Sequence, residues 1–443
     1  MPRVIHFPTL ENSLPPLGTP MDWERAHVWH PFTQMRDWCA TEPVMLVDAL
    51  GASVQDSHGR WYIDGNSSIW TNIHGHRHPR LDAALQSQLK HFAHTSFLGL
   101  THPGAAQLSA ELVALWPENT LSRVFLSDNG STAIEVALKM AAQYWQIKGR
   151  PEKQRLVAFE GAYHGDTLGA SSLGGVSTFT ERFAAWHLPV DHVDSISALE
   201  ALSADGVAAV VIEPLVQGAN QMRLWPSGLL AQVRQWCDWH GVFLIADEVM
   251  TGFGRTGTLF ACEQEGVVPD FVALAKGLTG GYMPLAATLT TERVFEAFLG
   301  GADKTLYYGH SYAGHALGCA VALENLAIFR EEGVLSRLQL QIQRLAALLE
   351  QHLRPSPFVY EIRQRGFLAG IELRAAGGAP FVAGAAGLGM GARVCVAARK
   401  YGLLTRPVRD TVVLMPPYCI TDLELERAVC AVAAGIEECC TKP

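Results

Sequence analysis

The sequence predicts an α/β protein with a large domain built on a mainly parallel sheet and a smaller α+β domain. Apolar strands alternate with amphipathic helices through the middle of the 443-residue chain, which is long enough for two or three domains. The strands are apolar at nearly every position, as is typical of strands that helices cover on both faces. From about residue 315 the pattern changes and helical sequence dominates.

Five strands of the larger sheet are predicted from short apolar runs that end in polar or glycine residues. In chain order they lie within residues 123–130, 155–165, 208–218, 241–249 and 270–277. Helices are predicted between several of them. Residues 131–149 form one helix, because Ile134 and Leu138 recur on one face and Gly149 ends the pattern. Residues 227–241 form another.

The C-terminal part of the chain has the pattern of the smaller domain. Its predicted elements are two helices, two stretches of strand and a final helix, at residues 315–333, 335–353, 359–373, 411–420 and 422–438. We therefore divide the chain into three parts. They are an N-terminal segment that joins the small domain, a large ligand-binding domain and a C-terminal small domain, at residues 1–71, 72–325 and 326–443.

Charge and composition argue against several functions. The net charge of -9 is the opposite of what nucleic acid or an anionic membrane surface attracts. No apolar run is long enough to span a bilayer, and the N-terminus lacks the apolar region of a signal peptide. The nine cysteines form no C-x-x-C pair, which favours reduced thiols in a cytoplasmic protein. We expect small-molecule substrates, without nucleic acid, membrane or metal.

Polar residues follow the predicted strands, at the sheet edge where open α/β sheets bind ligands. Gly130 and Ser131 open a helix, so their backbone N–H groups and the serine hydroxyl can hold a phosphate. A plain helix cap is the alternative. Asp247 and Glu248 end another strand. Only one of these two neighbours can face a site, because successive side chains of a strand point to opposite faces.

Lys276 ends the apolar strand 271–275, and a run of glycines follows it. A lysine held among apolar residues has a lowered pKa and becomes a usable amine nucleophile. A surface lysine just past a strand is the alternative. The glycines let another group come close to the backbone.

Together these features meet the requirements of pyridoxal 5'-phosphate. The cofactor needs an anion site, a carboxylate beside its pyridine nitrogen, an amine for its aldehyde and an aromatic ring to stack on. Gly130 with Ser131, Asp247, Lys276 and the aromatic segment 161–167 would supply them. The sequence therefore favours a pyridoxal-phosphate enzyme.

Several long segments resemble a known family. "LIADEVMTGFGRTGTLFACE" followed by "PDFVALAKGLTGGYMPLAA" is similar to the signature of the class III pyridoxal-phosphate aminotransferases, of fold type I. Within this class, "HVWHPFTQM", "DGNSSIWTNIHGHRHP", "YHGDT" and "RPVRDTVVLMPPY" resemble the 7,8-diaminopelargonate synthases of biotin synthesis. The resemblance covers nearly the whole chain. It implies a seven-stranded sheet and transfer of an amino group onto 8-amino-7-oxononanoate.

The resemblance also assigns roles to residues of the predicted site. Lys276 matches the lysine that binds the cofactor, Asp247 the carboxylate on the pyridine nitrogen, and Tyr163 the aromatic residue over cofactor and substrate. We name these three as catalytic. Gly130 and Ser131 match the phosphate site.

Substrate contacts follow from the same resemblance. Arg406 matches the arginine that binds the substrate carboxylate, and a planar guanidinium suits that task because it makes two parallel hydrogen bonds. Arg409 is a rival for this role. Phe32 and Trp70 would line the path of the substrate's tail, together with the aromatic residue over the cofactor, and Ile69 would lie in the donor pocket.

A loop of the chain matches one that a second subunit contributes to the site. Gly309, His310 and Ser311 lie in it, and the family's loop contacts both phosphate and substrate. The resemblance therefore implies a homodimer with a shared active site.

The amino donor stays open between S-adenosylmethionine and lysine. Synthases that use S-adenosylmethionine typically have "HPYT", "SSWW" and "GPTFxxNP" where this chain has "HPFT", "SSIW" and "GHSYAGHA". A branch of the family that uses lysine looks more like this chain. Another class III enzyme, an ω-amino-acid or ornithine aminotransferase, is the alternative function.

Two motifs allow other functions. "GFGRTG", residues 252–257, fits the dinucleotide-binding pattern after a strand, with Asp270 downstream, although it comes late in the sheet. "HGHRHP" could place His74, His76 and His78 on a metal, or form a polar turn before a helix. A regulator that binds the cofactor without turnover would carry a basic DNA-binding segment, and the sequence has no such segment.

Overall fold

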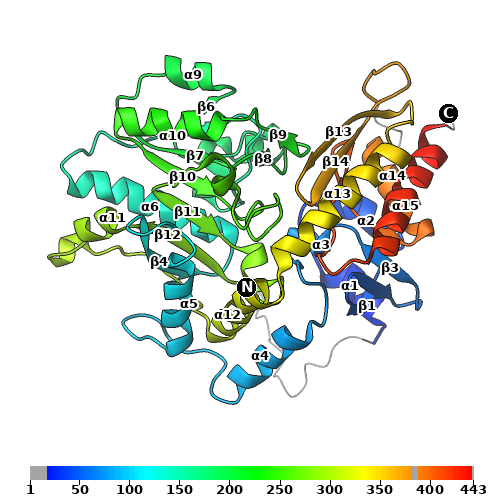
Figure 1. Cartoon of the computed structure of the whole chain (residues 1–443), viewed down its shortest axis with the longest axis horizontal. Coiled ribbons are helices and arrows are strands. Elements are labelled where there is room, and N and C mark those ends of the chain that lie inside the picture. Colours follow the sequence, from blue (N-terminus) through cyan, green and yellow to red (C-terminus); the bar gives the residue numbers. More distant parts are fainter. Residues whose placement is uncertain (1–16, 382–387, 442–443) are drawn as a thin grey trace, which may run out of the picture. The chain divides into compact units, whose positions relative to one another are not determined.

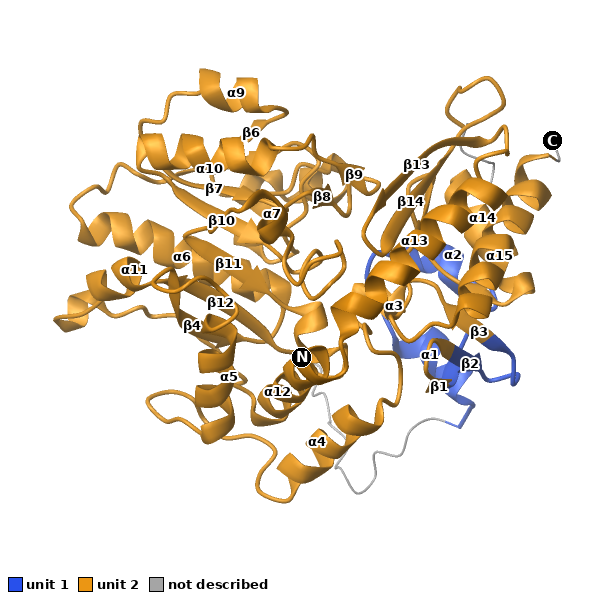
Figure 2. Cartoon of the chain, in the orientation of Figure 1, with its two compact units in different colours: residues 1–48, 54–61 blue, residues 49–53, 62–443 orange. Residues whose placement is uncertain are grey.

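The computed structural model describes residues 17–381 and 388–441. The chain divides into two compact units, one of residues 1–48 and 54–61 and the other of residues 49–53 and 62–443 (Figure 2). The first unit holds α1 (Pro20–His27), α2 (Met35–Cys39) and most of β1 (Leu46–Leu50) and β2 (Ser53–Asp56). Helix α1 begins where Thr19 and Asp22 cap each other's backbone N–H groups.

The second unit contains a seven-stranded sheet with the order β4-β12-β11-β10-β7-β5-β6 (Figure 1). Strand β12 runs antiparallel to both of its neighbours, and the other pairs are parallel. The carboxyl ends of all the strands except β12 therefore lie along one edge of the sheet. The strands are β4 (Leu121–Ser127), β5 (Arg155–Phe159), β6 (Val190–Val193), β7 (Val207–Ile212), β10 (Phe243–Asp247), β11 (Phe271–Leu274) and β12 (Ala286–Thr291).

The predicted fold class, with a mainly parallel seven-stranded sheet, is confirmed. Strands β5, β10 and β11 lie within the predicted segments, whereas β7 begins one residue and β4 two residues earlier than its segment. Apolar runs alone do not identify β6 and β12. Strand β6, "VDHV", is an edge strand with polar residues at its centre, and β12, "AATLTT", contains three threonines.

Helices cover both faces of this sheet because successive side chains of each strand point to opposite sides. On β10, Phe243 packs in the apolar cluster that includes α6 (Gly130–Ile147). Its neighbour Leu244 packs in the cluster that includes α10 (Leu229–His240) and α12 (Ala316–Glu331). The three helices were predicted from the sequence, and the structure confirms them.

An antiparallel sheet and three helices form the C-terminal part of this unit. The sheet has the order β13-β14-β17-β16, and α14 packs on α15. Strand β15 (Leu403–Leu404) runs parallel to β3 (Trp61–Asp64) at Ile63 and Asp64. The elements are α13 (Val334–His352), β13 (Val359–Arg365), β14 (Leu368–Leu373), α14 (Met390–Ala398), β16 (Pro407–Val408), β17 (Thr411–Leu414) and α15 (Asp422–Cys440). The division of the chain at residues 71 and 325 stays a prediction.

The remaining elements are short connections between those above. The helices are α3 (Ser67–Trp70), α4 (Pro79–Leu89), α5 (Pro103–Val113), α7 (Leu168–Ser172), α8 (Ser177–Thr180), α9 (Ile196–Ala201) and α11 (Glu292–Ala297). Strands β8 (Val216–Gln217) and β9 (Arg223–Leu224) form a hairpin. Tighter 3₁₀ turns are η2 (Glu181–Trp186), η3 (Ala261–Glu265), η4 (Lys276–Thr279), η5 (Ala302–Lys304) and η6 (Arg399–Tyr401).

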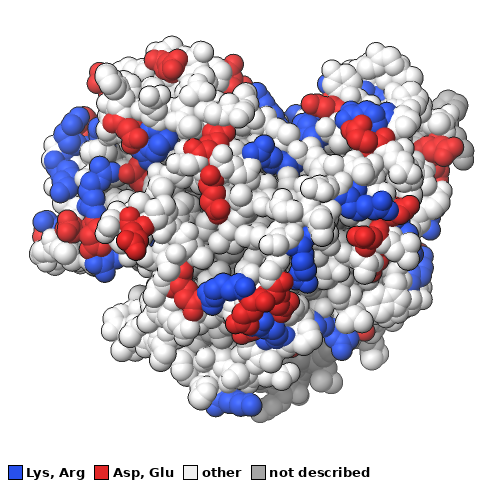
Figure 3. Space-filling model, viewed as in Figure 1, with Lys and Arg blue, Asp and Glu red and all other residues white. Residues whose placement is uncertain are grey.

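The charged side chains of the surface are mixed in sign. On the face shown in Figure 3, acidic and basic side chains are interspersed. Arg80 of α4, for example, pairs with Glu324 at 2.5 Å and Glu331 at 2.7 Å, both from α12. Within residues 17–381 and 388–441, no helix is both long enough and apolar enough to cross a bilayer.

Candidate active site

A cavity of about 430 Å³ opens at the carboxyl edge of the seven-stranded sheet. Residues that follow β4, β5, β7, β10 and β11 line it, because parallel strands bring their ends to the same edge. The predicted residues that line the cavity are Trp70, Gly130, Ser131, Tyr163, Asp247 and Lys276. The structure thus brings these six side chains or backbone groups to one place.

Lys276 stands where β11 ends and the chain turns into η4. Its backbone φ of +45° is left-handed, which costs a residue with a side chain about 1–2 kcal/mol. The Nζ atom lies 4.8 Å from the centroid of the Trp70 ring. Burial lowers the pKa of Lys276, while the charge of Asp247 opposes that shift. The neutral amine, which is the nucleophilic form, is therefore easier to reach than in an exposed lysine.

Asp247 forms a buried pair with His164 inside the cavity. Oδ2 of Asp247 lies 2.7 Å from Nδ1 of His164, and Oδ1 accepts a hydrogen bond of 3.0 Å from the N–H of Val249. Burial by itself lowers the pKa of His164, but the hydrogen bond and charge of Asp247 outweigh burial and the pKa is raised. Nδ1 of His164 carries a hydrogen and donates it to the Asp247 carboxylate.

Glu248 lies on the opposite face of β10 from Asp247. Its carboxylate accepts hydrogen bonds from the Thr251 hydroxyl and, at 2.8 Å, from the N–H of Cys262. Glu248 is buried in the core and does not line the cavity. The expectation that only one of the two adjacent carboxylates faces the site is confirmed.

The first turn of α6 forms the anion end of the cavity. The helix begins at Gly130, and the N–H groups of a first turn have no partners within their own helix. The Ser131 hydroxyl accepts a hydrogen bond of 3.1 Å from the N–H of Asp166. A Cβ atom on Gly130 would lie 2.8 Å from Cγ1 of Val249, so this position has room only for glycine. The arrangement suits a phosphate group.

The residues present fit pyridoxal 5'-phosphate. The cavity combines the anion end at α6, the carboxylate of Asp247 and the amine of Lys276. Nε2 of His164 is buried and has no hydrogen-bond partner among the described residues. Tyr163 supplies an aromatic wall, and its hydroxyl donates to Oδ2 of Asp166 at 2.6 Å. These are the group types that the cofactor requires.

Trp70 enters the cavity from a strained segment of the chain. Ser67, Ser68 and Trp70 have φ values of +44°, +62° and +65°, which residues with side chains rarely adopt. The indole N–H of Trp70 donates to Oδ1 of Asn66 at 2.7 Å. Ile69, predicted beside it, is 42% exposed and does not line the cavity.

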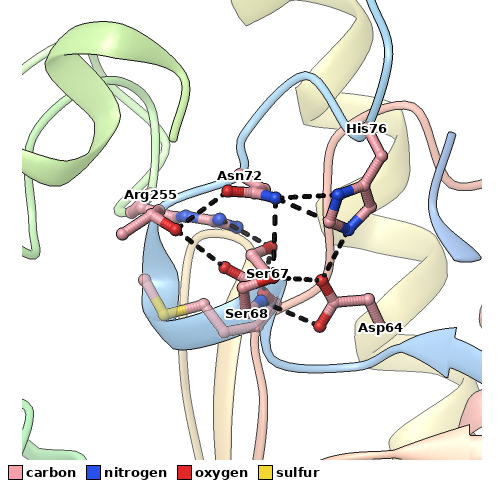
Figure 4. Close-up of polar contacts among 8 residues, drawn as sticks. Asp64, Ser67, Ser68, Asn72, His76 and Arg255 are labelled. Atoms are coloured by element: carbon pink, nitrogen blue, oxygen red, sulfur yellow. Dashed lines mark hydrogen bonds and ion pairs between the residues drawn. The ribbon is translucent and has the colours of Figure 1, made fainter. Parts of the chain in front are cut away.

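A polar network holds this segment in its conformation (Figure 4). Asp64 accepts hydrogen bonds from the N–H and the hydroxyl of Ser68, at 2.8 and 3.0 Å, and lies 3.0 Å from Nε2 of His76. Arg255, which is fully buried, donates to the hydroxyl of Ser67 at 2.9 Å. Strained backbone persists where its surroundings fix it, and these contacts fix the residues around Trp70.

Two cavity residues were given no role from the sequence. His164 lies within the quoted "YHGDT" segment, and its importance depends on burial beside Asp247. Glu213 directly follows the buried strand β7, in the same way that Asp247 ends β10. This position in the sequence could have identified Glu213 as a site residue. Glu213 accepts hydrogen bonds from the N–H groups of Tyr163 at 3.1 Å and Gly218 at 2.9 Å. Burial raises the pKa of Glu213 to about 7.

Two residues predicted to contact substrate are not among the residues that line this cavity. Arg406 is exposed, stands between β15 and β16, and does not line the cavity. Phe32 belongs to the first unit and has a left-handed φ of +52°. Both roles stay predictions.

The loop predicted to reach a second subunit lies near the anion end of this chain's own cavity. Nε2 of His310 is 3.4 Å from Oδ1 of Asp128, a cavity residue, without hydrogen-bond geometry. Gly309 and Ser311 do not line the cavity. The carbonyl of Ser311 lies 2.7 Å from Nε2 of His94, which ties the loop to the segment after α4.

The two competing motifs have other roles in the structure. No helix begins in residues 252–260, so "GFGRTG" is not a dinucleotide-binding turn, and the Asp270 carboxylate already pairs with Arg234 at 2.8 Å and Arg293 at 2.7 Å. Among the described residues, no three His, Cys, Asp or Glu side chains are grouped as metal ligands. "HGHRHP" does precede a helix, α4, as one reading predicted.

Fold and cavity together define a pyridoxal-phosphate enzyme of the aminotransferase type. The sequence model of the family described as aminotransferase class-III matches residues 36–435. The chain belongs to the class-III aminotransferases, and pyridoxal 5'-phosphate is its cofactor. The family that the sequence resembles is thereby confirmed.

Individual relatives point to one branch of the family. The chain is 46% identical to an adenosylmethionine-8-amino-7-oxononanoate aminotransferase of Nitratidesulfovibrio vulgaris, over 93% of this chain and 80% of the relative. It is 43% identical to the Geobacter sulfurreducens protein of the same name, over 91% of this chain and 94% of the relative. A crystal structure of the Methanocaldococcus jannaschii protein of that name has a TM-score of 0.91 at 34% identity, covering 94% of this chain and 98% of that chain.

Proposed function

We propose that the chain transfers an amino group from S-adenosylmethionine to 8-amino-7-oxononanoate, giving 7,8-diaminononanoate for biotin synthesis. One observation carries the proposal. Lys276, Asp247 with His164, and the first turn of α6 meet in one cavity of a chain whose relatives, at 46% and 43% identity, bear the name of this activity. The relatives' names also favour S-adenosylmethionine over lysine as donor, which the sequence left open.

The chain's own side chains have separate tasks in this reaction. Bound pyridoxal 5'-phosphate supplies an electron sink for a carbon next to the amino group. Nζ of Lys276 binds the cofactor and then carries a proton from and to the substrate carbon. Asp247, held by His164, keeps a proton on the pyridine nitrogen by its negative charge. Tyr163 and Trp70 enclose the reacting atoms and exclude water.

A second candidate is transfer from a simple amine or another ω-amino acid. The structure of an amine transaminase from an uncultivated Pseudomonas species, in its PLP-bound form, has a TM-score of 0.87 at 31% identity, covering 93% of this chain and 99% of that chain. The same overall fold and the same cofactor chemistry would serve either of the two candidate reactions. The two candidates differ in the acceptor and donor used.

The experiment that separates them is a donor and acceptor matrix. Purified, cofactor-loaded protein is given 8-amino-7-oxononanoate or pyruvate as acceptor, with S-adenosylmethionine, lysine, alanine or ornithine as donor. We expect 7,8-diaminononanoate to form fastest with S-adenosylmethionine. Product formation is followed by mass spectrometry. Faster amination of pyruvate than of 8-amino-7-oxononanoate with every donor would contradict the proposal, and lysine as the best donor would correct the donor alone.

Arg406 is the proposed anchor for the acceptor's carboxylate. Arg406→Ala should weaken 8-amino-7-oxononanoate by roughly 2 kcal/mol, the low end of the range for a lost charge pair, because the arginine is exposed in the chain described here. The measurement compares the apparent affinity for the acid with that for its methyl ester. The acid's advantage should disappear in Arg406→Ala and persist in the control Arg409→Ala. An unchanged advantage in Arg406→Ala would assign the carboxylate to another residue.

We also propose that the chain acts in the cytoplasm as a homodimer in which residues 309–311 complete the partner's site. Tyr307, Leu98 and Tyr312, on or beside this loop, are 82%, 74% and 58% exposed, and such aromatic and apolar groups suit burial against a second copy. Sedimentation of the cofactor-loaded protein tests the assembly. A single species at the 48.2 kDa mass of one chain would contradict it. Cell fractionation tests the compartment, and the nine cysteines, all free, suit a reducing one.

A further inference from the structure

Asn325 of α12 lies directly behind the turn that carries Lys276. Its side chain is completely buried. Nδ2 donates two hydrogen bonds of 3.0 Å, one to the carbonyl of Gly277 and one to the carbonyl of Leu278. A single amide group therefore fixes the first two residues after the lysine.

His74 completes this arrangement from the other side. Its Nε2 lies 2.8 Å from Oδ1 of Asn325. Because the Asn325 amide nitrogen faces two carbonyls, the oxygen faces His74, and Nε2 must carry the hydrogen. Burial lowers the pKa of His74 to about 3, so the ring is neutral and this N–H is kept. Phe329 and His78 enclose the ring, with centroids at 5.3 and 5.7 Å.

The turn needs such support because its own backbone is strained and short. Lys276 has a φ of +45°, and Gly280 ends the turn at +61°. Within the turn, Leu278 donates to Ala275 at 2.9 Å and Gly280 to Gly277 at 3.1 Å. A Cβ on Gly280 would lie 3.5 Å from the His74 ring and 3.7 Å from Asn325 Oδ1, so the pair packs against the end of the turn.

We propose that His74 and Asn325 are positioning residues that hold the Lys276 amine in its reactive place. The proposal rests on the proposed role of Lys276 as the cofactor-binding lysine. His74 acts only through Asn325, and Asn325 acts through the peptide groups that follow Lys276. A pair that merely stabilised the core between α12 and the sheet would affect unfolding but leave the amine's reactivity unchanged.

The test measures how fast Lys276 captures its cofactor. Cofactor-free protein is mixed with pyridoxal 5'-phosphate, reduced with borohydride at timed intervals, and labelled Lys276 is quantified by peptide mass spectrometry. Asn325→Leu and His74→Leu, which remove the hydrogen bonds at similar volume, should slow labelling by about tenfold or more, since small misplacements of a reacting group are costly. His74→Gln can place an amide N–H where Nε2 lies, and it should restore most of the rate.

Gln341→Leu is the matched control. The Gln341 amide also donates to two carbonyls, those of Tyr418 and Ile420, at 3.0 and 2.9 Å, but none of these residues lines the cavity. This variant should lose stability while labelling Lys276 at the unaltered rate. Equal labelling rates in Asn325→Leu, Gln341→Leu and the unaltered protein would overturn the proposal.

The other outcomes also decide the matter. If Asn325→Leu does not fold, the labelling rates of His74→Leu and His74→Gln are compared instead. A positioning role predicts different labelling rates for these two variants, and a purely structural role predicts equal rates. A label on a lysine other than Lys276 would instead overturn the role proposed for Lys276. A normal rate at Lys276 in every variant would leave the proposed function intact and remove only the role of the pair.

Discussion

A Lys276→Ala protein should still bind pyridoxal 5'-phosphate but form no covalent bond to it, and turnover should fall by about 10⁴–10⁶-fold. The magnitude is that of removing a residue that is both nucleophile and proton carrier. The alanine leaves the anion end at α6, the Asp247–His164 pair and the Tyr163 ring in place, so three of the four groups that the cofactor requires remain. Borohydride reduction followed by peptide mapping measures the covalent bond, and steady-state kinetics measure the turnover.

Lys153→Met is a matched control for this experiment. Lys153 is also a buried lysine, but its Nζ donates to the carbonyl of Gly241 at 2.7 Å, outside the cavity. Its variant should keep the covalent label on Lys276 and keep turnover. A pyridoxyl label on any lysine other than Lys276 in the unaltered protein would refute the assignment.

Asp247→Asn should lower turnover by roughly two to three powers of ten while the protein stays folded. The amide keeps the shape of the carboxylate but removes the negative charge that holds a proton on the pyridine nitrogen. It also removes the charge that raises the pKa of His164, so His164 loses its proton more readily. The measurement is turnover with saturating donor and acceptor, with the unfolding midpoint recorded for the same sample.

Glu248→Gln separates the effect of charge in the cavity from that of charge in the core. Glu248 is buried on the other face of β10, where Thr251 and Cys262 bind its carboxylate. This variant should be less stable than the unaltered protein but keep turnover within about tenfold, because its hydrogen bonds support the core. Turnover in Asp247→Asn close to that of the unaltered protein would exclude Asp247 as the partner of the pyridine nitrogen.

Local sequence patterns predicted the parts of the structure that depend on local residues. The five strands follow from short apolar runs, and the helices α6, α10, α12, α13 and α15 follow from helical stretches of sequence. Strand β12 is buried although it lacks an apolar run. Two of its threonine hydroxyls can be buried because they donate hydrogen bonds to distant carbonyl groups. Thr288 donates to the carbonyl of Ala133 at 2.7 Å, and Thr290 donates to that of Asp270 at 3.0 Å. Such partners cannot be found from the strand itself.

The candidate site likewise has residues that local sequence predicted and residues that it did not. Lys276, Asp247 and the start of α6 were predictable because each stands at the end of a strand, and parallel strand ends meet at one edge. The pair of His74 and Asn325 was not, because 251 positions separate the two residues in the chain. The pKa of His164 depends on Asp247 and that of Glu213 on burial, so residues from several strands determine them.

The direction of β12 also restricts how the reactive lysine can move. Because β12 returns antiparallel beside β11, residues 275–285 are anchored at both ends in the same sheet, with Leu274 paired to Ala287. A crossover connection would have tied the far end of this segment to a separate layer that could shift. Large displacement of Lys276 therefore requires the strands β11 and β12 to separate, which breaks hydrogen bonds of the seven-stranded sheet. The amine should thus sample few positions on the timescale of turnover.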